Sequence, residues 1–163
     1  MMYLNGQKGF IKDFFERTAK IIKSFEKINN DGCEVTLLCN CMLGIFIFPE
    51  QKFYNEITND SLSDANFKKL KQGLLGQKKP RSIKKIFSRM RNAIAHCNIR
   101  FECAENKKND NRIKYIYFYD DENYSDKKKL ESYEFQLRID IADLKDILFD
   151  FCDKILANEV YEV

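Results

Sequence analysis

Residues 90–98 read Met90-Arg91-Asn92-Ala93-Ile94-Ala95-His96-Cys97-Asn98, and they contain the only histidine of the chain. They close a segment, 81–97, whose pattern predicts an amphipathic helix. At about 100° per residue, apolar side chains fall within about a third of its circumference: Ile83, Ile86, Phe87, Met90, Ile94 and Cys97. This stripe predicts that the helix lies against the core. We therefore expect the fold to be organised around it.

The opposite face of this predicted helix is polar and carries the histidine. Lys85, Arg89, Asn92 and His96 fall together there, and Asn92 and His96 are i, i+4 neighbours that can touch. Arg91 lies on the flank, from which its long side chain can swing toward His96. A histidine that serves only in the core would lie on the apolar stripe. The alternative to catalysis is a surface or interface histidine with no chemical role.

The helix belongs to a segment with one sign of charge. Residues 65–101 contain no Asp or Glu, and their lysines and arginines number eleven: Lys68, Lys69, Lys71, Lys78, Lys79, Arg81, Lys84, Lys85, Arg89, Arg91 and Arg100. Because the whole chain carries +3, the rest of it carries −8. A charge run is often only a solvated face, but a basic block in an otherwise acidic chain favours a polyanionic partner.

Length and composition indicate one globular domain over residues 1–163, of which 44% are hydrophobic. The start of the chain does not resemble a signal peptide, and the most apolar run, 35–49, is too short to span a bilayer. We therefore expect a cytoplasmic protein without a membrane partner. The six cysteines lack zinc-finger spacing, and we expect buried, reduced thiols.

Apolar periodicity predicts four further helices, at residues 8–29, 33–48, 64–75 and 140–158. Ile21 belongs to the apolar stripe of the first, and Ser63 is a suitable N-cap for the third.

Residues 98–139 alternate instead, which predicts a small antiparallel meander of two or three strands. Tyr115, Tyr117 and Tyr119 share one face of its middle strand. Bases could stack on that face, but packing on a helix is the commoner use of such residues.

Several chemistries lack their motifs in this chain. It has no Gly-rich phosphate loop and no nucleophile elbow, and one histidine cannot build a multi-histidine zinc site. No metal or cofactor is therefore expected.

A single histidine beside arginines suits metal-independent RNA cleavage. The imidazole can take a proton from the ribose 2′-OH or give one to the leaving 5′-oxygen, and arginine can bind the scissile phosphate with two hydrogen bonds. One histidine cannot easily be both base and acid in one step. Two protomers across a two-fold axis would supply two.

The motif Arg91-Asn92-Ala93-Ile94-Ala95-His96 resembles the R-x4-6-H signature of HEPN domains, which has a polar residue directly after the arginine. The order of elements is also similar to small stand-alone bacterial HEPN proteins: a long first helix, an apolar second helix, the motif on a later helix and a final amphipathic helix. The resemblance implies a mainly α fold, a HEPN-like helical bundle with residues 98–139 as a small antiparallel β-insert.

The resemblance further implies a metal-independent endoribonuclease for single-stranded or loop RNA, as in toxin–antitoxin or phage-defence systems. It makes Arg91 and His96 the catalytic pair and Asn92 their support, in a homodimer with a composite active site and with a possible antitoxin or regulatory partner. Lys84, Lys85 and Arg89 are expected to bind and steer the RNA. The alternative is a non-catalytic RNA-binding or dimerisation module of HEPN type.

Overall fold

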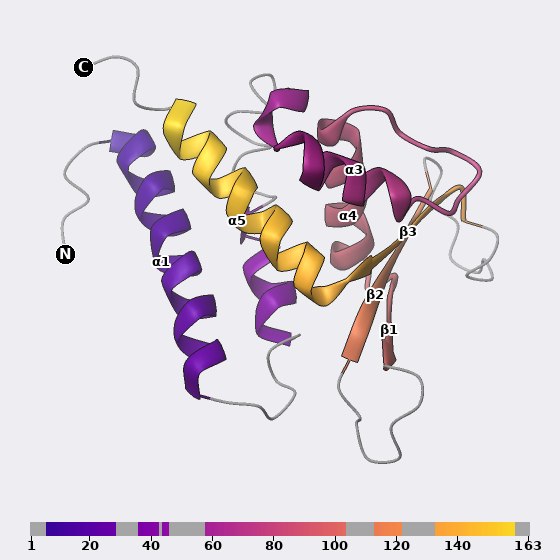
Figure 1. Cartoon of the computed structure of the whole chain (residues 1–163), viewed down its shortest axis with the longest axis horizontal. Coiled ribbons are helices and arrows are strands. Elements are labelled where there is room, and N and C mark those ends of the chain that lie inside the picture. Colours follow the sequence, from indigo (N-terminus) through magenta and orange to yellow (C-terminus); the bar gives the residue numbers. More distant parts are fainter. Residues whose placement is uncertain are drawn as a thin grey trace.

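The chain folds into helices packed beside a small antiparallel sheet (Figure 1). The computed structural model describes residues 6–28, 36–42, 44–45, 58–103, 113–121 and 133–158. Its elements are α1 (Gly6–Ile28), η1 (Asn59–Ser61), α3 (Asp64–Gln72), α4 (Ile83–Ala95), β1 (Ile99–Cys103), β2 (Ile113–Asp120), β3 (Phe135–Asp140) and α5 (Ile141–Asn158). Residues 36–42 and 44–45 are also helical. The mainly helical class with a small β-meander is thus confirmed.

The helix α5 lies between α1 and α3, and the sheet lies on the far side of the molecule from α1 (Figure 1). The predicted apolar stripe of α4 is confirmed, because its members within the helix are buried: Ile83, Ile86, Phe87, Met90 and Ile94. The Phe87 ring meets the Phe151 ring of α5 edge to face, with centroids 4.8 Å apart. Each such side chain contributes about 1.5–3 kcal/mol through burial, so α4 is held in the core against both the sheet and α5.

The first helix buries only part of the stripe that its periodicity predicts. Ile21 is 51% exposed, whereas Phe15 and Ile22 are 0% and 3% exposed. Phe14, which belongs to the same predicted stripe as Ile21, is partly buried against the core, so the core-facing side of α1 is rotated from the predicted stripe but still includes part of it. In the described part of the chain, no helix is both long enough and apolar enough to cross a membrane.

The strands form an antiparallel sheet of order β1-β2-β3. In β2, Ile116 and Phe118 are fully buried. Since successive side chains of a strand alternate between faces, Tyr115 and Tyr117 lie on the other face, where the Arg138 guanidinium carbon is 3.5 Å from the Tyr115 ring centre. The expected packing of these two tyrosines on a helix is therefore wrong.

The helix α3 is shorter than predicted because the chain after it runs along β3. Leu74 pairs with Leu137 as an isolated antiparallel bridge, and the Leu75 N–H donates to the Gln136 carbonyl at 2.9 Å. The two residues were expected to continue the helix. A strand edge that offers unpaired carbonyls takes them instead, which ends the helix at Gln72.

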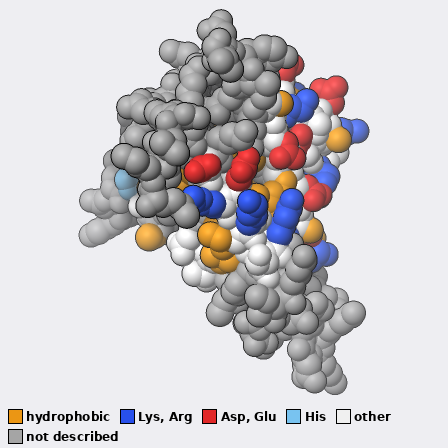
Figure 2. All heavy atoms as spheres, turned by 90° about the vertical axis from the view of Figure 1, so that its left-hand side faces the viewer, with side chains coloured by type: hydrophobic (Ala, Val, Ile, Leu, Met, Phe, Trp, Pro, Cys, Tyr) orange, Lys and Arg blue, Asp and Glu red, His pale blue; other side chains and the backbone are white. Residues whose placement is uncertain are grey.

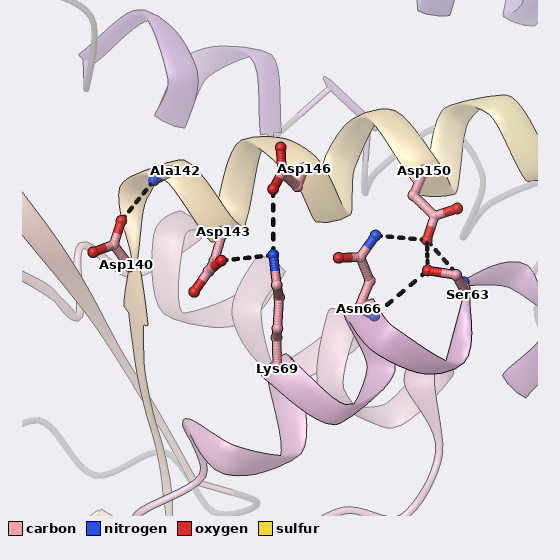
Figure 3. Close-up of polar contacts among 8 residues, drawn as sticks. All are labelled: Ser63, Asn66, Lys69, Asp140, Ala142, Asp143, Asp146 and Asp150. Carbon is pink, nitrogen blue, oxygen red and sulfur yellow. Dashed lines mark hydrogen bonds and ion pairs between the residues drawn. The ribbon is translucent and has the colours of Figure 1, made fainter.

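The start of α3 is fixed to α5 by one carboxylate (Figure 3). Ser63 is the N-cap, as predicted, and its hydroxyl accepts from the Asn66 N–H. The Asp150 Oδ2 in turn accepts from the Ser63 N–H at 2.8 Å, the Ser63 hydroxyl at 2.7 Å and the Asn66 Nδ2 at 2.8 Å. One turn nearer the sheet, Lys69 Nζ lies 2.7 Å from Asp143 and 3.2 Å from Asp146 (Figure 3).

The pKa of Asp150 predicts how this contact depends on pH. Burial raises that pKa, but the hydrogen bonds from Asn66 and Ser63 outweigh it and hold the pKa below its ordinary value of 3.8. A carboxyl group with a lowered pKa stabilises the folded state above its unfolded pKa, and this contribution is lost as the pH falls through its folded pKa. We expect Asp150→Asn to lower the free energy of unfolding near neutral pH, and the difference from wild type to shrink as the pH falls below 3.8, the ordinary pKa of this carboxyl group.

Urea unfolding of both proteins across this pH range measures the difference. Ser63→Ala removes one hydrogen-bond donor to Asp150. In that background the effect of Asp150→Asn on the free energy of unfolding should be smaller. A difference that does not change with pH would contradict the proposed hydrogen bonding.

Candidate active site on the motif helix

The histidine lies just beyond the end of α4 and not inside the helix as predicted. The helix ends at Ala95, and His96 is its C-cap. Cys97 follows with a φ of 56°, its N–H donating to the Ile94 carbonyl at 3.0 Å while the Asn98 N–H donates to the Ala93 carbonyl at 2.7 Å. These two bonds are those of a Schellman motif, which satisfies the last helical carbonyls and reverses the chain.

This turn leaves His96 exposed while its backbone stays bound to the helix. The His96 N–H donates to the Asn92 carbonyl at 2.9 Å, and the side chain of His96 is exposed. The prediction that His96 lies off the apolar stripe is confirmed. An exposed imidazole at a rigid helix end is accessible to a large substrate.

A buried carboxylate supports the same helix from the sheet. Asp120, the last residue of β2, is 5% exposed. Its Oδ2 accepts from Arg89 Nη1 at 2.9 Å and from Asn92 Nδ2 at 3.3 Å. Both donors come from α4, one turn apart, so the carboxylate joins the sheet to the polar side of that helix.

Asn92 also contacts Arg91, the arginine of the motif. Its Oδ1 accepts from Arg91 Nη2 at 2.5 Å and from Arg91 Nε at 3.1 Å. The side-chain amide of Asn92 therefore bridges Arg91 and Asp120, and these bonds hold Arg91 against the helix. The role of Asn92 as a support of the catalytic pair stays a prediction, and in this structure the residue that its side chain contacts is Arg91.

The three residues expected to bind RNA lie in two environments. Lys85 and Arg89 line a hollow beside the start of α4, together with Lys78 and Lys79. Lys84 is half-buried and does not line this hollow.

Sequence reasoning missed both Asp120 and the two lysines of the preceding segment. A signal for Asp120 was present, because strand alternation places it on the same face as Ile116 and Phe118. A buried acid needs donors, and the basic helix supplies them.

The described cysteines differ in burial, and Cys41 is half-buried, which raises the pKa of its thiol. Cys39 and Cys152 are buried, and burial raises the pKa of their thiols to about 11 and about 12, respectively. Cys97 and Cys103 are exposed, so the expectation of buried thiols is wrong for them; Cys33 lies outside the described residues. Within the described ranges, no group of three histidine, cysteine, aspartate or glutamate side chains could hold a metal ion.

Comparison with known proteins gives one family. A family model described as HEPN pEK499 p136 matches residues 1–162. No curated protein and no solved structure matches the chain significantly.

The Asp120 contacts predict a large effect of removing its carboxylate. Asp120→Ala should lower the free energy of unfolding by about 3 kcal/mol, since it leaves the Arg89 guanidinium without its buried counter-charge. Asp120→Asn keeps an acceptor oxygen and should cost less. Arg89 and Asp120 interact directly. The double variant Arg89→Ala/Asp120→Ala should therefore lose less free energy of unfolding than the two single variants together.

Urea unfolding of wild type, the three single variants and the double variant measures these changes. Asp146→Ala is the matched control, because Asp146 is 64% exposed and its ion pair is worth about 0–1 kcal/mol. Equal losses from Asp120→Ala and Asp146→Ala would contradict the role given to Asp120.

Proposed function

The chain belongs to the HEPN pEK499 p136 family, and from this premise we propose that it is a metal-independent endoribonuclease for single-stranded or loop RNA. The observation that carries the proposal is the arrangement of the R-x4-6-H residues at the end of α4. Its histidine is exposed, and its arginine is held by Asn92, which is itself bound to a buried carboxylate. The long side chain of Arg91 is thereby held by hydrogen bonds on a helix, and a catalytic site needs its groups held in this way.

In this mechanism His96 acts as the general acid–base. It takes the proton of the ribose 2′-OH as that oxygen attacks the adjacent phosphorus. The bond from phosphorus to the 5′-oxygen breaks, and the leaving oxygen takes up a proton. The products are a 2′,3′-cyclic phosphate and a 5′-hydroxyl, so no water is consumed in this step.

Arg91 binds the scissile phosphate and stabilises the negative charge that builds on its oxygens in the transition state. The hydrogen bonds from Arg91 to Asn92 use Nε and Nη2. These hydrogen bonds orient the guanidinium in the free protein, before RNA binds, which lowers the entropic cost of binding. Asn92 is accordingly a positioning residue.

The second proton transfer requires a second group. We propose that a second copy of the chain contributes its own His96, in a homodimer with one composite site. His96 lies at an exposed helix end, which supports this arrangement because the imidazole is accessible to another protomer. A role in a toxin–antitoxin or phage-defence system, with an antitoxin or regulatory partner, belongs to the same proposal.

The test is RNA cleavage in the presence of EDTA. Wild type should cleave a labelled single-stranded RNA and give the cyclic phosphate, whereas His96→Ala and Arg91→Ala should each lower the rate by at least about 10²-fold, as expected when an acid–base or charge-stabilising group is lost. End-group analysis of the products and single-turnover rates provide the measurements.

Arg17→Ala is the matched control, because it removes the same charge from an exposed position on α1 and should leave the rate unchanged. Cleavage that survives in both His96→Ala and Arg91→Ala would overturn the assignment. Salt-sensitive RNA binding by wild type without any cleavage would instead support a non-catalytic RNA-binding module of the same family.

A further inference from the structure

A basic hollow of about 240 Å³ lies next to the motif helix. It is lined by four cationic side chains, one acidic side chain, one aromatic side chain and a proline: Lys78, Lys79, Lys85, Arg89, Glu134, Phe135 and Pro80. These residues come from three places in the chain, namely the segment after α3, the first half of α4 and the chain at the start of β3. The hollow is thus a product of the fold and not of one helix face.

The segment after α3 is held in place by its backbone. The Lys78 N–H donates to the Glu134 carbonyl at 2.9 Å. Gly76 makes the approach possible, because a Cβ there would lie 2.3 Å from the Glu134 carbonyl oxygen, closer than any real contact. This backbone pairing fixes where Lys78 and Lys79 enter the hollow.

The hollow has an excess of positive charge. Lys78 Nζ lies 2.8 Å from the Glu134 carboxylate, and Arg89 Nη1 lies 2.9 Å from the Asp120 carboxylate. These acids balance two of the four cations. The charges of Lys79 and Lys85, both exposed, form the excess that an anion would meet.

Two other parts of the described surface are more balanced. A second hollow, between α1 and α5, is lined by Lys20 and Lys23 but also by Glu16 and Asp153. On the side of the molecule that carries α1, basic and acidic side chains lie next to one another (Figure 2). The excess of cations therefore distinguishes the hollow beside α4 from the hollow between α1 and α5.

The hollow is connected to the motif through shared residues. Arg89 lines the hollow and also binds Asp120, which binds Asn92 of the motif. Phe135, which lines the hollow, pairs with Asp120 across the sheet. Lys85 of α4 precedes His96, the C-cap of this helix, by eleven positions, which corresponds to about 16 Å along the helix axis.

We propose that this hollow binds a backbone phosphate of the single-stranded RNA at a distance from the bond that is cleaved, with Lys79 and Lys85 as the binding residues. This inference rests on the proposed function, since it makes the hollow a subsite of the same substrate. A phosphodiester is the matching ligand class, because lysine provides compact positive charge for phosphate oxygens without reading the base. The hollow therefore sets the position of the RNA along α4 and not its sequence.

The experiment measures binding separately from cleavage. A fluorescein-labelled, 2′-O-methylated 12-mer cannot form the cyclic phosphate, and its affinity is measured by fluorescence anisotropy over a series of salt concentrations. Lys79→Ala/Lys85→Ala should weaken binding by about tenfold at low salt and reduce the slope of log K against log salt by about 0.7, the value for one phosphate contact of a single strand. Both lysines are exposed, so the variant should unfold at the temperature of wild type.

Lys20→Ala/Lys23→Ala is the matched control, because it removes the same charge from the balanced hollow and should leave affinity and slope nearly unchanged. Lys79→Arg/Lys85→Arg should retain binding. Equal losses from both alanine pairs would show a general charge effect and overturn the inference, as would no loss from Lys79→Ala/Lys85→Ala. Binding of AMP or inorganic phosphate that depends on these lysines, without RNA binding, would assign the hollow to a small anion and overturn the RNA assignment.

The result is independent of the proposed catalysis. If wild type does not cleave RNA but the Lys79→Ala/Lys85→Ala effect on the 12-mer is present, the ribonuclease proposal fails and the phosphate subsite stands. If cleavage by wild type requires His96 but the 12-mer binds equally well to Lys79→Ala/Lys85→Ala, the ribonuclease proposal stands and the phosphate subsite fails.

Discussion

The buried carboxylate of Asp120 is the constraint on which the motif depends. An anion removed from water needs donors that compensate its lost hydration, and both donors come from one side of α4. Because Asn92 gives its Nδ2 to Asp120, its Oδ1 faces the other way and accepts from Arg91. The direction of the motif arginine is therefore set by an acidic residue at the end of a strand, which no motif within the helix contains.

The turn after α4 has two consequences at once. It exposes His96, and it starts β1 only two residues after Cys97, with Ile99 opposite Phe118 of β2. The Tyr119 N–H then donates to the Asn98 carbonyl at 3.0 Å, next to the strand end that carries Asp120. The chain reversal that presents the histidine thus also aligns the strand that supports the arginine. A change at this turn would act on both members of the motif.

Local patterns predicted the parts of this structure that depend on local physics. The apolar stripe of α4, the N-cap at Ser63 and the alternation of the strands are properties of neighbouring residues. The Asp120 contacts join residues 28 and 31 positions apart, so periodicity could not find them. The end of α4 was missed because the residue with positive φ is Cys97, whereas glycine or asparagine is the usual signal. Leu74 and Leu75 continue the apolar pattern of α3, but pairing with β3 decides their conformation.

The basic block of residues 65–101 is also less uniform than its charge count indicates. Several of its cations have structural partners: Lys69 contacts two aspartates of α5, Lys71 lies 4.1 Å from the centre of the Phe67 ring, and Arg89 contacts Asp120. A cation that already has a close counter-charge or ring has less to gain from a phosphate, because binding must first replace that contact. Lys79 and Lys85 are exposed, and no carboxylate of the described residues forms an ion pair with them. The charge run predicts a class of partner, and the tertiary contacts separate the cations that already have a structural role from those that a polyanion could reach.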